Sequence, residues 1–291
     1  MNVQWIVVLK VFVVVFWLFC ASINTSLAAA TQQETDKHTS FLVFGILPIV
    51  SPEQLVRRFG PLADYLGKKL GVEIRIETAP NYKEFVKRTN QQQRYDILLT
   101  APHFYYLARH KAGYRSLVRV DRPVMQMLIV VPVHSDIRKV RDLAGRRLAI
   151  VDPLALGTML VREHFLRSGL DPDRDVTLVT TPNHNNSLLA AYKGLTDASA
   201  LMVSPFMRAN PEIRKKMRII DRTMGTPTLP ISVAPWVSHD RAELIMKILL
   251  SLGHNQHGKA LLKHIGWPGF VPVQPEEYDV LKSIAQQVPL N

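Results

Sequence analysis

The feature that most constrains the fold is a strand–helix–strand pattern that occurs twice along the chain. In the first copy, an apolar strand at 41–47 is followed by Ser51, a helix N-cap, by apolar residues at helical spacing up to Gly71, and by an alternating strand at 72–76. The second copy has its strand, helix and strand at 147–151, 158–168 and 176–180. Because a strand–helix–strand unit places its two strands side by side and parallel, both copies predict an α/β fold.

Two long extended segments, 125–133 and 229–237, connect the two α/β sets. They predict two lobes, each a mainly parallel sheet flanked by helices, with the second lobe inserted in the first. Lobe 1 is then formed by residues 41–128 and 230–291, and lobe 2 by residues 129–229. The two extended crossings would act as a hinge, and a ligand-binding cleft would lie between the lobes.

Residues 1–30 form an apolar run that contains one basic residue, Lys10, and ends in small residues, as a secretory signal peptide does. We predict export to the periplasm with cleavage near Ala29 to Thr31. A retained membrane anchor is the alternative, because the run is long enough to span a bilayer. Cys20 is the only cysteine, so the processed chain would have none, which excludes disulfides, thiolate nucleophiles and cysteine metal sites.

The charge balance is basic, since 36 Lys and Arg residues outnumber 24 Asp and Glu residues and give a formal net charge of +12. Such a field attracts small anions or anionic membrane surfaces. Nucleic acid is the other usual partner of a basic protein, but the basic residues are scattered and an exported chain seldom meets it. We therefore predict no nucleic-acid partner.

Signs of catalysis, cofactors or metals are few. The densest histidine cluster, His254, His257 and His264, has no neighbouring carboxylate or thiolate in the sequence, so no metal site is predicted. No Walker loop, dinucleotide fingerprint, nucleophile elbow or zinc-protease helix occurs. The chain is thus predicted to be no enzyme and to need no cofactor.

Ligands of open α/β sheets bind beyond the carboxyl ends of strands, where the next helix begins. This rule selects four turns, at 48–51, 100–103, 153–158 and 183–187. The candidate site is predicted there.

Short motifs follow one another in order along the chain. They are FGILP at 44–48, PLADYLG at 61–67, APNY at 79–82, YDI at 95–97, AP at 101–102, DLAG at 142–145, DP at 152–153, NH at 183–184 and IGWP at 265–268. Their order and spacing resemble the periplasmic phosphate, phosphite and phosphonate binding proteins of ABC transporters, over about residues 41–278. The resemblance implies the two-lobed type II periplasmic-binding fold, closure on a small ligand without chemistry, and delivery to a membrane permease.

The resemblance also implies which residues contact the ligand. They are Tyr82, Thr100, Ala101, His103, Ala155, Leu156, Gly157, Thr158, Asn183, His184 and Asn185. Asn185 stands where the family has an acidic residue that holds an amino group in aminophosphonate binders, which argues against that ligand.

The largest departure from the family lies in the turn after Asp152-Pro153, where the family has a row of hydroxyl side chains. Here the row has become Ala155, Leu156 and Gly157, and only Thr158 keeps a hydroxyl. Each lost charge-assisted hydrogen bond weakens the free energy of binding by about 1.5–3 kcal/mol. Binding of a phosphonate by the family's usual side-chain hydroxyls is therefore not expected. Thr158 either contacts the ligand or caps its helix, and Leu156 either lines a less polar pocket or packs inward.

We therefore predict an exported, monomeric solute-binding protein that closes on a small, phosphate- or phosphonate-like oxyanion for an ABC permease. The altered turn motivates an alternative, a periplasmic sensing module that presents a ligand other than phosphonate to a membrane kinase or cyclase. An enzyme on the same fold would need a titratable pair across the cleft, for which only His103 and His184 are available.

Overall fold

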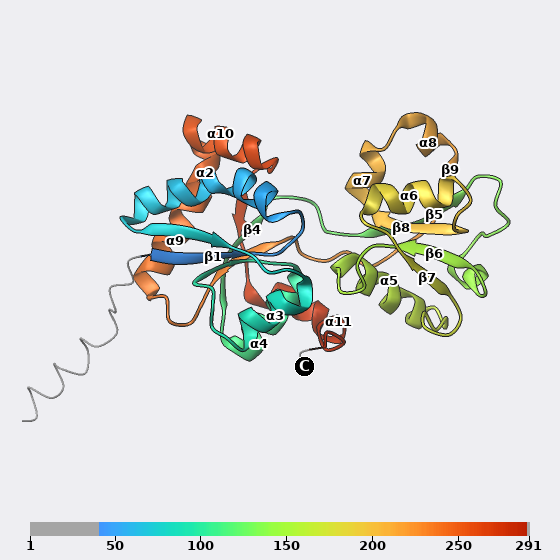
Figure 1. Ribbon diagram of the computed structural model, residues 1–291, viewed down its shortest axis with the longest axis horizontal. Coiled ribbons are helices and arrows are strands. Elements are labelled where there is room, and N and C mark those ends of the chain that lie inside the picture. Colours follow the sequence, from blue (N-terminus) through green and yellow to red (C-terminus); the bar gives the residue numbers. More distant parts are fainter. Residues whose placement is uncertain (1–40, 290–291) are drawn as a thin grey trace, which may run out of the picture. The chain divides into compact units, whose positions relative to one another are not determined.

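The computed structural model describes residues 41–289, which form two β-sheets flanked by helices (Figure 1). The predicted leader, residues 1–30, lies outside the described residues. Strands of the second sheet all come from residues 127–222, and those of the first sheet come from the segments before and after them. Within the described residues, no helix is both long and apolar enough to cross a membrane.

The first sheet has the strand order β11-β4-β10-β3-β1-β2. Its strands are β1 (Phe41–Ile46), β2 (Glu73–Glu77), β3 (Ile97–Leu99), β4 (Arg115–Val120), β10 (Pro230–Val233) and β11 (Phe270–Pro272). One group of contacting helices consists of α2 (Pro52–Leu70), α9 (His239–Ser251) and α10 (Gln256–Ile265), with the short 3₁₀ helix η2 (Leu252–His254). The other group consists of α3 (Tyr82–Asn90), α4 (Pro102–Ala112), η3 (Pro275–Leu281) and α11 (Lys282–Ala285). Figure 1 shows α3 and α4 on the opposite side of the sheet from α2.

The second sheet has the strand order β7-β6-β8-β5-β9. Its strands are β5 (Met127–Pro132), β6 (Arg147–Ile150), β7 (Thr177–Thr180), β8 (Ala198–Met202) and β9 (Met217–Arg222). Its helices are η1 (Val140–Leu143), α5 (Leu156–Arg167), α6 (His184–Tyr192), α7 (Val203–Arg208) and α8 (Pro211–Lys215). Helices α6 and α7 lie on one side of this sheet and α5 on the other (Figure 1).

Both predicted strand–helix–strand units are confirmed, because β1 pairs in parallel with β2 and β3, and β6 pairs in parallel with β7 and β8. The expectation of mainly parallel sheets holds only for these strands. Strand β10 is antiparallel to β3 and β4, β11 to β4, and β5 to β8 and β9. The sheets are mixed because each extended crossing segment runs back into a sheet and contributes a strand of opposite direction, β5 in one case and β10 in the other.

The two parallel units share one structural detail at the start of their third strand. An Asp96 carboxylate oxygen accepts a hydrogen bond from the backbone N–H of Val43 at 2.7 Å, and the Asp96 N–H donates to the Val43 carbonyl at 2.9 Å. Asp197 forms the same pair of bonds with Arg147, at 2.7 and 2.9 Å. Both aspartates therefore have a structural role, since each joins two neighbouring parallel strands.

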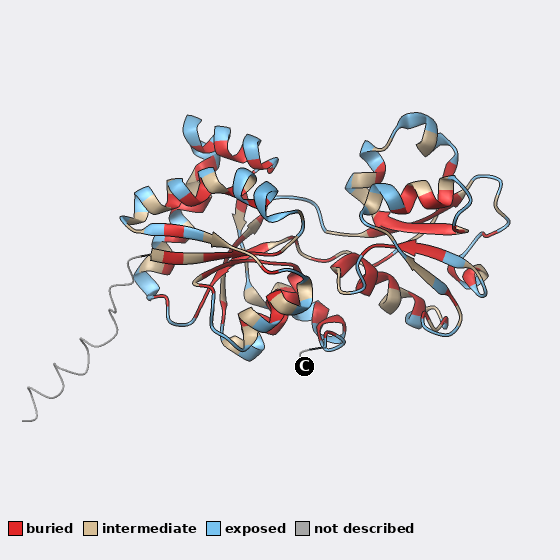
Figure 2. Ribbon diagram, viewed as in Figure 1, coloured by how far each residue is buried: buried red, intermediate tan, exposed pale blue. Residues whose placement is uncertain are grey.

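The core follows the predicted periodicities. Helix α2 buries Leu55, Phe59, Leu62, Ala63 and Leu66 and begins and ends where its signals indicate, at the Ser51 cap and at Gly71 in the left-handed conformation. Figure 2 shows buried residues along the inner strands, such as β3, β5, β8 and β10, while the outer helix faces are exposed. A separate small apolar cluster, with Leu188 and Phe206, fills the space between the second sheet and helices α6 and α7.

Candidate functional site

Four helices, α3, α4, α5 and α6, begin directly after the carboxyl ends of parallel strands, but their N-termini differ chemically. Asn81 and Asn183 cap α3 and α6, each accepting a backbone hydrogen bond from the first turn. Helices α4 and α5 instead have Ala101 and Ala155 at the cap position, with no side-chain cap bond. Since the first backbone N–H groups of a helix have no intrahelical acceptor, α4 and α5 present unsatisfied donors, which is the usual chemistry of an anion site.

The first turn of α4 contacts the turn before α5 through His103. Its side chain is fully buried, and Nε2 lies 3.0 Å from the carbonyl oxygen of Leu154. Because a carbonyl oxygen only accepts, Nε2 carries the proton. Burial lowers the pKa of His103 to about 4, so the imidazole is neutral at neutral pH and Nδ1 is an acceptor.

Two buried polar atoms near this contact have no hydrogen-bond partner within the described residues. They are His103 Nδ1 and the hydroxyl oxygen of Thr100, whose residue is 1% exposed. Buried polar atoms are nearly always paired with protein or water. These two atoms therefore mark the turn after β3 as a place for a ligand atom or a bound water.

Tyr82, the first residue of α3, belongs to the same neighbourhood. Its ring meets the edge of the Phe104 ring at 5.9 Å and 72°. Burial, together with the negative charge of Asp152, raises the pKa of Tyr82 to about 12. The hydroxyl stays protonated at neutral pH and is available as a hydrogen-bond donor.

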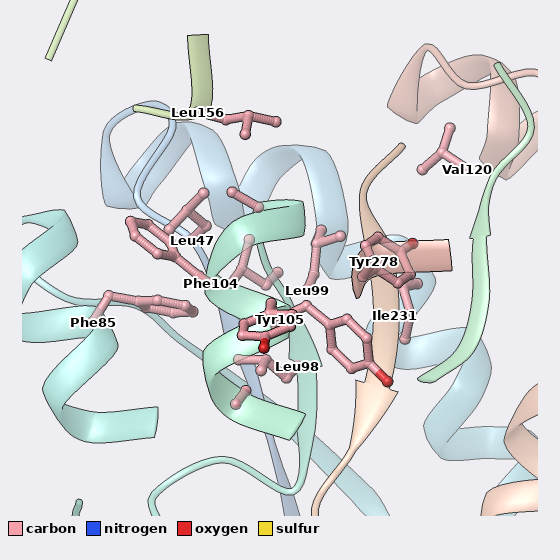
Figure 3. Close-up of a cluster of buried hydrophobic side chains, with 14 of the residues drawn as sticks. Leu47, Phe85, Leu98, Leu99, Phe104, Tyr105, Val120, Leu156, Ile231 and Tyr278 are labelled. Atoms are coloured by element: carbon pink, nitrogen blue, oxygen red, sulfur yellow. The ribbon is translucent and has the colours of Figure 1, made fainter. Parts of the chain in front are cut away.

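Side chains in the first turn of α5 point into the protein. The Thr158 hydroxyl donates to the carbonyl of Val151 at 3.3 Å, and Thr158 is 1% exposed. Since α5 begins at Leu156 with Ala155 as its N-cap, the interpretation of Thr158 as the helix cap is wrong. Leu156 is 4% exposed and lies at the edge of the apolar cluster shown in Figure 3. Leu156 thus packs inward, and the turn offers backbone N–H groups rather than side chains.

Gly157 brings this turn close to the second sheet. A Cβ atom at this position would lie 2.6 Å from Met127 Sδ, closer than real Cβ contacts occur. A side chain at this position would therefore displace the end of the buried Met127 side chain, independently of any ligand.

The remaining predicted residues lie at the start of α6. Asn183, His184 and Asn185 line a cavity of about 270 Å³ together with Pro205 and Arg208. Burial lowers the pKa of His184 to about 4, and its Nδ1 atom is buried without a partner in the described part of the chain. No residue of the group around His103 lines this cavity, so the structure places the predicted residues in two groups.

Sequence reasoning missed a larger cavity of about 630 Å³ that shares Pro205 and Arg208 with the one at α6. It is lined by Val120, Arg122, Pro123, Val124, Met125, Gln126, Met202, Val203, Ser204, Pro205, Arg208, Arg222, Thr228, Leu229 and Trp267. Helix α7 begins directly after β8 and obeys the same carboxyl-end rule as the four turns selected from the sequence. Applying the rule to residues 203–205 would have found one wall of this cavity.

Comparison with known proteins identifies the family. A family model for the periplasmic substrate-binding proteins of phosphonate ABC transporters matches residues 44–278. The chain belongs to this family. Its members bind a substrate for an ABC transporter, so the chain is a binding protein and not an enzyme.

Individual relatives are similar over nearly the whole chain. The phosphonates-binding periplasmic protein of Escherichia coli is 23% identical over 261 residues, which are 86% of this chain and 76% of the relative. A Xanthomonas citri protein solved with bound ATP has a TM-score of 0.74 at 20% identity, covering 86% of this chain and 97% of the other. A Prochlorococcus marinus protein solved with methylphosphonate has a TM-score of 0.71 at 14% identity, covering 87% and 99%. These likenesses confirm the type II periplasmic-binding fold.

Proposed function

We propose that this chain is exported to the periplasm, where it binds a small oxyanion of the phosphate or phosphonate class and delivers it to an ABC permease. The observation that carries the proposal is the pair of uncapped helix N-termini, α4 and α5, whose turns touch through His103 and Leu154. Free N–H groups and the positive end of the helix dipole favour an anion at such positions. In this chain, backbone donors would replace the hydroxyl row of the family.

The relatives support this ligand class. The Escherichia coli protein is named for phosphonates, and the Prochlorococcus marinus and Xanthomonas citri structures contain methylphosphonate and ATP. All three ligands carry oxygen atoms on phosphorus, which accept hydrogen bonds from backbone N–H groups. Protonated Tyr82 can donate to the same oxygens without adding charge. The free atom of neutral His103 is the acceptor Nδ1, which pairs with a protonated ligand oxygen or a water, because an anionic oxygen does not donate.

We assign the ligand-binding residues in two groups. The first consists of Tyr82, Thr100, Ala101, His103, Ala155, Leu156, Gly157 and Thr158, the last three acting through their backbone. The second consists of Asn183, His184 and Asn185. In a lobe formed by 129–229, the turns before α5 and α6 follow the neighbouring strands β6 and β7. Closure of a lobe formed by 41–128 and 230–291 on it would bring Tyr82, Thr100, Ala101 and His103 to the same ligand.

Membership in a transporter family favours delivery to a permease over presentation to a membrane kinase or cyclase. The altered turn after Asp152-Pro153 changes which groups donate hydrogen bonds to the ligand. It gives no reason to expect a different membrane partner.

Thermal denaturation and calorimetric titration of the purified chain test the proposal, with inorganic phosphate and methylphosphonate as ligands and sodium chloride as the ionic control. A ligand present at 100 times its Kd stabilises the folded state by about 2.7 kcal/mol. For a domain of this size, the melting temperature then rises by roughly 5–10 °C. If no oxyanion of the phosphate or phosphonate class raises the melting temperature above the chloride control, the proposed function is wrong. The intact mass of the periplasmic protein reports whether the leader has been removed.

A further inference from the structure

The cavity of about 630 Å³ has an unusual charge pattern. Three arginines, Arg122, Arg208 and Arg222, line it, and its lining contains neither aspartate nor glutamate. Within residues 41–289, none of the three forms a salt bridge. Arginine is the side chain best suited to hold carboxylate and phosphate groups, because its planar fork donates two parallel hydrogen bonds.

The three guanidinium groups come from separate elements of the fold. Arg122 follows β4 and donates a hydrogen bond to the Gly266 carbonyl, whereas Arg208 ends α7 and Arg222 ends β9. Ten other arginines of the described chain find an acidic partner, from Arg75 to Arg174. All three arginines are exposed, so solvent screens their mutual repulsion, and an anion held between them is attracted to each.

The rest of the lining is mostly apolar and includes the indole of Trp267. That ring is held in place by Phe59 and Phe270, at centroid distances of 5.4 and 5.7 Å. The cavity volume falls within the roughly 300–1,000 Å³ typical of pockets for drug-sized ligands. A single phosphonate group with a methyl substituent is far too small to fill it. An occupant that satisfies the lining has an apolar body and a negative charge.

The cavity adjoins both groups of candidate site residues. It shares Pro205 and Arg208 with the cavity at His184. On the other side, Met127 packs against the first turn of α5 at Gly157, and the two residues before Met127 line the large cavity. The start of α5 and the arginine-lined cavity are therefore neighbours at the start of β5.

We propose that the physiological ligand is an organic phosphonate or phosphate that carries an apolar body and a second anionic group, and that the arginine-lined cavity binds this second part. The inference rests on the proposed function, because the first anionic group occupies the site at the helix N-termini. The cavity then determines specificity within the oxyanion class.

Three ligands of graded structure test this inference by calorimetric titration: methylphosphonate, phenylphosphonate and para-phosphonobenzoate. We expect para-phosphonobenzoate to bind most tightly and methylphosphonate least tightly. Arg222→Gln should weaken para-phosphonobenzoate binding about tenfold or more and leave methylphosphonate binding within about twofold of the wild type. Arg222→Glu should weaken it further, since it places a like charge beside the second anionic group. Arg138 is an exposed arginine outside the cavity lining, so Arg138→Gln is the matched control. It should leave the affinity for both ligands unchanged.

The outcomes separate the two proposals. Equal affinity for all three ligands, together with no effect of the Arg222 variants, overturns the cavity assignment and leaves the proposed function standing. If Arg222→Gln lowers the affinity for methylphosphonate and for para-phosphonobenzoate by the same factor, the cavity assignment is also overturned. The arginine would then bind the phosphonate group itself. If none of the three ligands binds and phosphate fails as well, the proposed function is wrong and the inference falls with it.

Discussion

Giving α5 the side-chain cap that it lacks should make the protein more stable and a weaker binder. Ala155 has extended backbone angles, φ −63° and ψ 138°, which are those of a helix N-cap. An asparagine there accepts a hydrogen bond from a backbone N–H of the first turn, as Asn81 and Asn183 do at α3 and α6. The same N–H groups are the donors that we assign to the ligand, so the cap and the ligand compete for them.

The size of both effects follows from the geometry. An N-cap side chain contributes about 1 kcal/mol, which raises the melting temperature of a domain of this size by about 2–4 °C. Loss of one charge-assisted hydrogen bond weakens binding by about 1.5–3 kcal/mol, or roughly 10- to 100-fold in Kd. Ala155→Asp should weaken binding more than Ala155→Asn does, because the carboxylate also repels the anion.

Calorimetric melting without ligand and titration with methylphosphonate measure the two effects separately. Ser238→Ala is the matched control, because Ser238 caps α9 in the same way, outside both groups of site residues. It should lower the melting temperature and leave the affinity unchanged. The reasoning is refuted if Ala155→Asn raises the melting temperature while methylphosphonate binds with wild-type affinity.

Two further predictions concern the buried residues of the site. As the pH falls from about 6.5 to about 4, the unfolded chain binds a proton that buried His103 does not, so the folded state should lose on the order of 3 kcal/mol. Melting curves against pH should show a smaller loss in His103→Gln, which keeps a donor for the Leu154 carbonyl, whereas the exposed His134→Gln should follow the wild type. Gly157→Ala should lower the free energy of unfolding by about 1–3 kcal/mol, measured by urea denaturation, because its Cβ would overlap Met127. The control Gly60→Ala, with open space around a helical glycine, should instead stabilise by up to about 1 kcal/mol, and equal effects of the two substitutions would contradict the packing argument.

The elements that the sequence predicted well are those whose signal is local. Helix α2 is an example, since its cap, its apolar spacing and its terminal glycine all lie within one segment and act on the backbone directly. The parallel strands around it follow because a strand–helix–strand segment has few ways to bury its apolar face. By contrast, β4, β9 and β11 were not predicted, because each is short or carries polar residues and is stabilised by pairing with distant segments.

The sequence by itself determined the fold class, the family, and the turns at which helices begin beside the ends of strands. It did not decide the direction of the side chains in those turns. Only the tertiary structure shows that Leu156 and Thr158 face the core, and that α4 and α5 lack side-chain caps where they meet. It alone brings Arg122, Arg208 and Arg222 to one cavity. The physical reason is that periodicity and capping act between neighbours in the chain, whereas the lining of the cavity is assembled from separate segments that contain Arg122, Arg208, Arg222 and Trp267.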